Sequence, residues 1–201
     1  FTTLSDDIGS ISGFTPLRSI IHLHSPWSHD ACDGAGYVDG EIDTACLADL
    51  RAALCTTSID VAYLTDHPSY AAFQPYEDLF FQHEGDTPLS VNGVTVATQL
   101  NCDSGHTAMW VPGIEDELMP VGLEAHAAAP GDVADTLYNA RTIETIDAVH
   151  GVEGVVLMAH TEGKTLEDLI ALQADGLQGV EIFNLHAMLD PTKREEDLGL
   201  D

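Results

Sequence analysis

Three apolar runs along this chain each end in histidine, and this pattern constrains the fold more than any other feature. The runs cover residues 20–24, 61–67 and 155–160. Short, continuously apolar runs of this kind are typical of strands buried inside a sheet. Side chains two residues apart on a strand leave the same face, so His22 and His24 are expected to point together. Any one such histidine is commonly structural, but three in the same setting favour a shared site.

Segments with helical spacing alternate with these runs. The first helix is expected to begin at Asp43 or Thr44, because either side chain can cap it. An Asn92-Gly93 pair between valines predicts a hairpin turn. The alternation predicts an α/β fold around a parallel sheet, open or closed into a barrel, in a single domain over residues 1–201. The expected helices cover residues 44–54, 132–150 and 166–174, and the expected strands residues 19–24, 59–65, 107–111, 121–125, 154–158 and 179–183.

The charge balance limits the partners of the chain. It carries 34 acidic against 6 basic side chains, a formal charge of −28, with 44% hydrophobic residues. Such a charge repels nucleic acid and anionic membranes, so neither is expected as a partner. No apolar run is long enough to span a bilayer. An acidic surface that keeps the protein hydrated in high salt is the favoured explanation; calcium sites are the alternative, although no EF-hand pattern occurs.

The four cysteines indicate an oxidising environment. Cys32, Cys46, Cys55 and Cys102 form no C-x-x-C pair, which argues against a zinc knuckle or a thioredoxin-type site. Their even number is compatible with disulfides. We therefore expect an exported protein, extracellular or periplasmic.

Candidate metal ligands gather where the predicted strands end, which is where parallel α/β folds collect their chemistry. Glu115 follows Pro112-Gly113 and is placed to bridge two cations, and Glu124 and His126 offer a second carboxylate and imidazole. Mixed histidine and carboxylate ligands suit zinc, manganese or iron. The histidines expected at the strand ends are His24, His67 and His160.

Five short motifs in order resemble the PHP (polymerase and histidinol phosphatase) family of metal-dependent phosphoesterases. The order and approximate spacing of that family hold over residues 19–184. The matches are H-x-H-[ST]-x-x-S at residues 22–28, T-D-H at 65–67, P-G-x-E at 112–115, A-H at 159–160 and v-E-x-x-N at 180–184.

The resemblance implies a distorted seven-stranded β/α barrel that holds two or three divalent metal ions. By position, Glu115 would bridge the two closest ions, with Glu124 as its competitor. His67 would bind at a third position, and Asp66 would orient a ligand or relay protons. His29 or His67 could protonate the leaving group. The ligands implied for the two closest ions are His22, His24, Glu115, His126 and His160.

The chain departs from the family pattern in three places. His29-Asp30 stands where the family has aspartate and glycine, and either residue could bind the third ion. The loop over residues 32–44 is longer than usual and is a candidate for a disulfide. The closing D-x-H pair of the family is absent after Glu181, so the last strands of the barrel are expected to be missing from this sequence.

The expected function is hydrolysis of a small phosphate ester by a metal-activated water. Lys164 and Arg18 are among very few cations available for phosphate, which disfavours a large polyanionic substrate. Two alternatives stay open: a hydrolase of amides or carboxyl esters on a similar barrel, and a non-catalytic metal-binding module. The sequence does not fix the oligomeric state.

Overall fold

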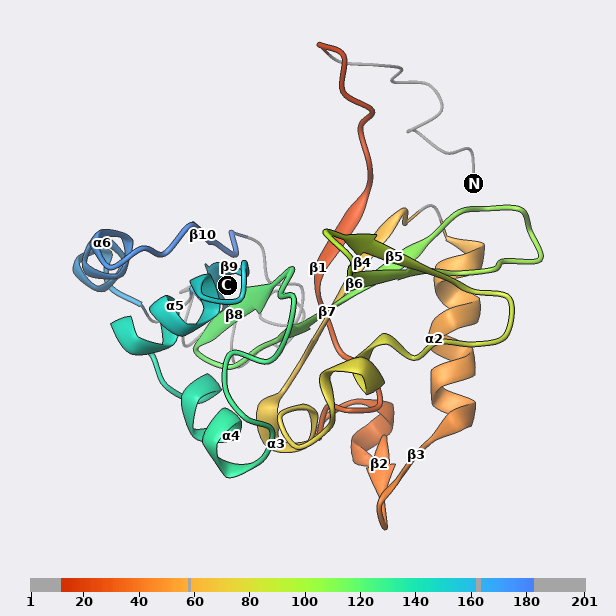
Figure 1. The fold of residues 1–201 in the computed structure, drawn as a ribbon, viewed down its shortest axis with the longest axis horizontal. Helices are drawn as coiled ribbons and strands as arrows, with labels where there is room; N and C mark the ends of the chain where they lie inside the picture. The colour runs from red at the N-terminus through yellow and green to blue at the C-terminus, as the bar shows by residue number, and fades with distance from the viewer. Residues whose placement is uncertain (1–11, 58, 162–163, 183–201) are drawn as a thin grey trace, which may run out of the picture.

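The computed structural model describes residues 12–57, 59–161 and 164–182. Within them the chain forms a mixed α/β fold around one curled sheet (Figure 1). The strands are β1 (Ser19–Leu23), β2 (Tyr37–Val38), β3 (Glu41–Ile42), β4 (Val61–Asp66), β5 (Thr87–Val91), β6 (Val94–Gln99), β7 (Met109–Ile114), β8 (Leu118–Val121), β9 (Val155–Met158) and β10 (Gly179–Val180). The helices are α2 (Thr44–Thr56), α3 (Pro68–Ala71), α4 (Asp132–Tyr138), α5 (Ile143–His150) and α6 (Leu166–Ala174), with 3₁₀ turns η1 (Cys32–Gly34) and η2 (Tyr76–Phe80).

Strand β4 organises the half of the sheet that contains the N-terminal strand. It is apolar and almost entirely buried, as a strand with neighbours on both edges must be. It pairs in parallel with β1 on one edge and with β7 on the other. The carboxyl ends of these three strands therefore lie at one edge of the sheet, where His24, His67 and Glu115 follow them.

Strand β8 reverses the direction of the sheet. It runs antiparallel to β7 and β9, while β9 and β10 are parallel to each other. A Cβ atom on Gly113 would lie 2.8 Å from the carbonyl oxygen of Pro120 and 3.0 Å from the Cγ2 atom of Thr65. Only glycine therefore allows β8 to approach so closely at the end of β7, just before Glu115.

The expected α/β class is confirmed, but the described residues do not form a closed seven-stranded barrel. The main sheet follows the order β1-β4-β7-β8-β9-β10, with the β5–β6 hairpin added to β7 and a separate β2–β3 ribbon. Its two edges, β1 and β10, are not paired with each other in the part of the chain that the structure describes. The hairpin turn predicted at Asn92-Gly93 is confirmed, since both residues have the positive φ values that such turns use.

Two expected elements differ from the structure. The strand expected over residues 121–125 ends at Val121, because Gly122 takes a φ of 68° and turns the chain. The helix expected over residues 132–150 is broken into α4 and α5, since Thr142 is an extended N-cap that accepts a bond from the backbone of Thr145. Of the strand expected over 179–183 and the motif at 180–184, residues 183 and 184 lie outside the described residues.

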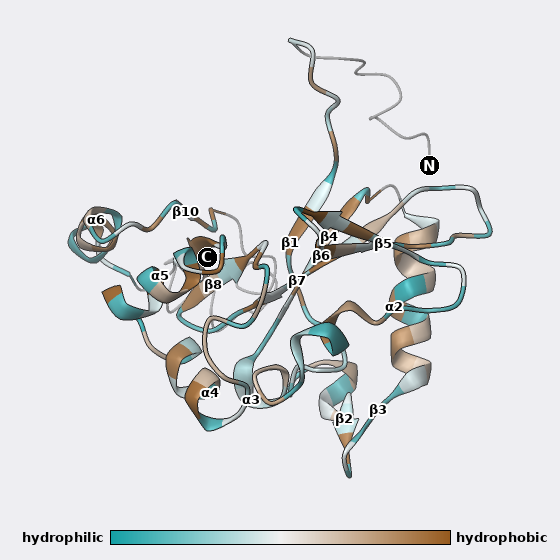
Figure 2. Ribbon diagram, in the orientation of Figure 1, coloured by the Kyte–Doolittle hydropathy of each residue, from teal (hydrophilic) through white to brown (hydrophobic). Residues whose placement is uncertain are grey.

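Within the described residues, the core consists of two main clusters, one around β4 and β7 and the other around β8 and β9. Helix α2 packs Leu47 and Leu54 into a cluster with Leu64, Trp110 and Ile114. Helices α5 and α6 cover β8 and β9 on the other side, around Leu118 and the residues near it. Figure 2 shows apolar and polar bands alternating along α2, as expected of a helix with one buried face. None of the helices that the structure describes is long and apolar enough to cross a membrane.

Two disulfides fasten α2 to the rest of the molecule. Cys46 in its first turns pairs with Cys32, and Cys55 near its end pairs with Cys102. The first bond ties the long loop after β1 to the helix, as the length of that loop suggested. Asp43 caps α2 by accepting from the backbone of Ala45 and Cys46, which is one of the two predicted caps.

Candidate metal centre

Glu115 is the centre of the candidate site. Its side chain is 1% exposed, and it lies just beyond β7 among imidazoles from three other segments. Its Oε1 atom lies 3.1 Å from Nε2 of His160. Its Oε2 atom lies 3.0 Å from Nδ1 of His67, 3.6 Å from Nε2 of His24 and 3.8 Å from Nε2 of His22. The two oxygens thus face different groups of histidines, which is the arrangement that a bridging carboxylate needs.

Three of these imidazoles are oriented in the same way, each by a hydrogen bond from its Nδ1 atom to an oxygen. Nδ1–H of His22 donates to Oε1 of Glu181 at 3.0 Å, and Nδ1–H of His67 donates to the backbone oxygen of Glu115 at 3.0 Å. Nδ1–H of His24 donates to Oδ1 of Asp30 at 2.7 Å. When Nδ1 carries the proton, the lone pair of a neutral imidazole is on Nε2. Such outer hydrogen bonds are the usual way in which proteins orient metal-binding histidines.

Two buried polar atoms at this point have no hydrogen-bond partner among the described residues. They are Nε2 of His24 and Oε2 of Glu115, which lie 3.6 Å apart. Buried polar atoms without partners are costly in a folded protein, so the pair indicates a missing partner. Two ligands that each lie about 2.1 Å from a tetrahedral zinc ion stand roughly 3.4 Å apart. The spacing and chemistry of these donors, together with His22, therefore fit a divalent cation.

A second group of possible ligands adjoins the first. His24, Asp30 and His67 offer donor atoms close enough to hold an ion, and Oδ2 of Asp30 lies 3.6 Å from Nε2 of His67. The sequence left either His29 or Asp30 open for this position. The structure brings Asp30 between the two histidines, whereas the exposed His29 ring lies against that of His67, 4.5 Å between centroids.

Two buried serines hold the loop that carries these ligands. Ser28 donates to Oδ1 of Asp30 at 2.6 Å and accepts from the backbone N–H of His67 at 3.4 Å. Ser25 donates both its backbone N–H and its hydroxyl to the carboxylate of Asp66. Asp66 therefore anchors the chain directly after His24, which agrees with an orienting role.

The electrostatics of the cluster follow from its burial. Burial alone would raise the pKa of Glu115, but the imidazoles of His160, His24, His67 and His22 outweigh it and lower the pKa to about 2. Asp66 shows the opposite outcome, because its burial dominates over the bonds from Ser25 and raises its pKa to about 6. The centre thus holds a carboxylate that is ionised at neutral pH, as a metal ligand must be.

His126 and Glu124 are not part of this cluster. Nε2 of His126 lies 3.0 Å from the backbone oxygen of Gln74, and Nδ1 lies 3.3 Å from the hydroxyl of Tyr138. Its ring also packs against that of Tyr76. The backbone N–H of Glu124 donates to the carbonyl of Val152 at 3.0 Å. The turn at Gly122 carries both residues away from the edge where β7 ends.

Of the two cations expected to hold phosphate, Lys164 is paired with a carboxylate and Arg18 lies at the far end of β1. Lys164 and Arg141 both pair with the carboxylate of Glu117. Arg18 precedes β1, at the opposite end of that strand from His24.

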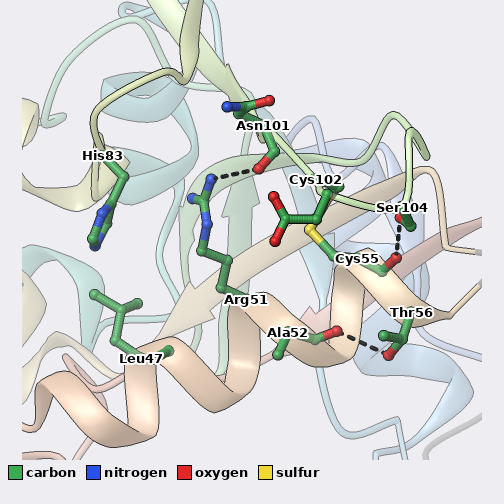
Figure 3. A pocket seen from close by; sticks show the side chains of 11 residues that line it. Leu47, Arg51, Ala52, Cys55, Thr56, His83, Asn101, Cys102 and Ser104 are labelled. Carbon is green, nitrogen blue, oxygen red and sulfur yellow. Dashed lines mark hydrogen bonds between the residues drawn. A yellow bond between two sulfur atoms is a disulfide. The ribbon is translucent and has the colours of Figure 1, made fainter.

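A separate surface pocket of about 350 Å³ lies between α2 and the loop after β6 (Figure 3). Arg51 extends from α2 toward Asn101, and its guanidinium is already bound by Asp86. The lining contains one histidine, His83, and the Cys55–Cys102 disulfide. This pocket lacks the converging ligands of the Glu115 cluster, so we place the candidate function at the cluster.

Comparison with known proteins adds no relative. No protein-family model matches the chain, and no curated protein or solved structure shows significant similarity to it.

Proposed function

We propose that this protein is a metal-dependent hydrolase that cleaves a small phosphate ester, with a site of the PHP type on an incomplete barrel. One observation carries the proposal: three imidazoles are each fixed through Nδ1. His22 and His24 present Nε2 toward the buried carboxylate of Glu115, and His67 presents Nε2 toward the carboxylate of Asp30. Nε2 of His24 and Oε2 of Glu115 lie 3.6 Å apart, too far for a good hydrogen bond and close to the separation of two ligands of one ion, which supports the proposal.

Two or three divalent ions, of zinc, manganese or iron, would be held here. His22, His24 and Glu115 would bind one, His160 faces the other oxygen of Glu115, and a further group adjoins at Asp30 and His67. An ion so bound supplies Lewis acidity and a water of lowered pKa.

The residues around the ions would take distinct roles. His29 is exposed at the mouth of the cluster beside His67, so it is our candidate for protonating the leaving oxygen. His67 is less suited to that step, because both of its ring nitrogens face oxygen atoms of Glu115 and Asp30. Asp66 positions the loop rather than moving protons, since Ser25 occupies its carboxylate.

The charge around the site favours a small substrate. Lys164 and Arg141 are already paired with the carboxylate of Glu117, so the ions themselves would bind the phosphate oxygens. A polyanion such as DNA would meet the acidic surface beyond them, and we propose neither nucleic acid nor membrane as a partner.

The same scarcity of free cations favours one alternative, a hydrolase of amides or carboxyl esters. Its neutral substrate needs no positive side chains beside the metal. A non-catalytic metal-binding module is the remaining possibility. We also propose an exported, salt-adapted protein, which the two disulfides and the charge of −28 support.

The decisive experiment measures metal content first and activity second. After reconstitution with manganese or zinc, we expect at least one ion per chain and hydrolysis of p-nitrophenyl phosphate above that of p-nitrophenyl acetate and of an anilide. The His24→Ala variant should lose both the ion and the activity. Preference for acetate or anilide would favour the alternative hydrolase, and less than one ion per chain would exclude the enzymatic proposal.

A further inference from the structure

We propose that Glu181 is the positioning residue of this site: a single carboxylate that sets the tautomer of His22 and holds the backbone of His160. The inference rests on the metal site proposed above and assigns to it a residue far from the motifs that supply its ligands.

The first contact joins Glu181 to the ring of His22. Oε1 of Glu181 lies 3.0 Å from Nδ1 of His22, and the two side chains are 11% and 17% exposed. A carboxylate accepts hydrogen bonds and cannot donate them when ionised. It therefore keeps the proton on Nδ1 and leaves the lone pair of Nε2 directed at Glu115, 3.8 Å away.

The second contact joins the same carboxylate to the backbone of His160. Oε2 of Glu181 accepts from the N–H of His160 at 3.2 Å. His160 has a φ of 48°, a left-handed conformation that residues other than glycine rarely adopt. This conformation accompanies the approach of its Nε2 atom to within 3.1 Å of Glu115.

Glu181 is itself held by its backbone. Its N–H donates to the carbonyl of Met158 at 2.8 Å, and its carbonyl accepts from the hydroxyl of Thr161 at 2.8 Å. The carboxylate is thus attached to the end of β9, next to the histidine that it fixes. Two of the four imidazoles around Glu115 depend on it.

Glutamate is required here because both neighbours are donors. A glutamine has one accepting oxygen and one donating NH₂ group. If its oxygen serves the N–H of His160, its NH₂ group faces Nδ1 of His22 and favours the tautomer with the proton on Nε2. That tautomer carries its lone pair on Nδ1, so Nε2, the nitrogen that faces the site, has none to offer an ion.

The test compares Glu181→Gln with Glu84→Gln, a substitution at an exposed glutamate away from the site. Nitrogen-15 NMR of the imidazoles in metal-free protein reads the tautomer of His22, and titration with zinc reads the affinity. We expect the Nδ1–H form in the wild type and in Glu84→Gln, and the Nε2–H form in Glu181→Gln. We expect zinc to bind Glu181→Gln about 10–100-fold more weakly, the usual effect of losing an outer-shell partner.

An unchanged His22 tautomer together with an unchanged zinc affinity in Glu181→Gln would overturn the proposal. If Glu181→Gln does not fold, Glu181→Asp provides the same test, because its carboxylate is one methylene shorter and is expected to lose the ring of His22. Wild-type protein that binds no ion would refute the proposed function instead. The tautomer, which is read without metal, would still decide the role of Glu181.

Discussion

Glu115 places a buried negative charge among four imidazoles, and such a charge is stable only with a partner. The histidines lower its pKa in the metal-free protein, and a cation would compensate the charge more fully. The side chains that meet here come from separate parts of the sequence. Substitutions at Glu115 and at His126 test which of the residues suggested by the sequence bind the ion.

We expect Glu115→Gln to abolish tight zinc binding, with a loss larger than the roughly 10–100-fold effect of an outer-shell change. Glu124→Gln is the matched control, because Glu124 competed for the bridging role from sequence but lies outside the cluster. Isothermal titration with zinc measures both. The reverse order of effects would assign the bridge to Glu124.

His126 makes the stability of the protein sensitive to acid. Burial is the main cause that lowers its pKa below the ordinary value of 6.5. The unfolded chain therefore binds the proton more readily, so the stabilising contribution is complete above pH 6.5 and is lost as the pH falls below it.

For the His126→Gln variant we expect unchanged zinc affinity, a stability about 1–3 kcal/mol lower at neutral pH, and a flatter decline on acidification. Chemical denaturation between pH 5 and 8 (a range set by the titration of histidine) measures the second and third effects. Loss of zinc binding would instead support the ligand role that the PHP resemblance implies.

The site residues that could be predicted from the sequence are those placed by strand alternation or by the end of a strand. The alternation of β1 and the ends of β4, β7 and β9 correctly bring His22, His24 and their partners together. His126 lies outside the cluster, because the strand before it ends early and the chain turns at Gly122. The resemblance offered Asp30 beside His29 and placed Glu181 in a motif, but their hydrogen bonds to His24 and His22 are tertiary, and nothing in the sequence indicates them.

The antiparallel direction of β8 was predictable from the sequence, although not from its hydrophobic periodicity. Only three residues connect β7 to β8, and a parallel crossover needs a dozen or more. The antiparallel pairing therefore follows from the length of the connection. The parallel strands β1, β4 and β7 were predictable because each is a short apolar run, and α2 because its cap and its leucines agree.

The two disulfides should differ in their effect on the site. They close loops with sequence separations of 14 and 47 residues, so each should stabilise the protein by about 3–4 kcal/mol. Only the Cys32–Cys46 bond fastens the loop that carries Asp30. Cys32 and Asp33 in that loop both have positive φ values, which an unfastened loop has little reason to keep.

We expect the double variant Cys32→Ser/Cys46→Ser to lose both stability and zinc affinity. The double variant Cys55→Ser/Cys102→Ser should lose stability alone, since that bond attaches the same helix away from the site. Thermal melting and zinc titration of both variants provide the comparison. Equal zinc affinity in the two variants would show that the loop keeps its shape without its disulfide.

For the whole molecule, the charge of −28 dominates the response to salt. Repulsion among surface carboxylates destabilises the compact state, and ions screen it over a Debye length of about 10 Å at 0.1 M, which shortens as salt rises. We expect the melting temperature to rise with potassium chloride. Sucrose at equal osmolality controls for general exclusion effects, and a melting temperature indifferent to salt would contradict a salt-adapted surface.

The contact between His22 and Glu181 joins positions 159 residues apart, on β1 and just after β10, which are the two edge strands of the main sheet among the described residues. A growing polypeptide holds the first of these long before it has made the second. The proposed ion site can therefore be complete only after nearly all of the described chain has emerged from the ribosome. The centre would join β1 and the chain after β10 late in synthesis. A fragment that ends before Glu181 would lack the hydrogen bond that orients His22.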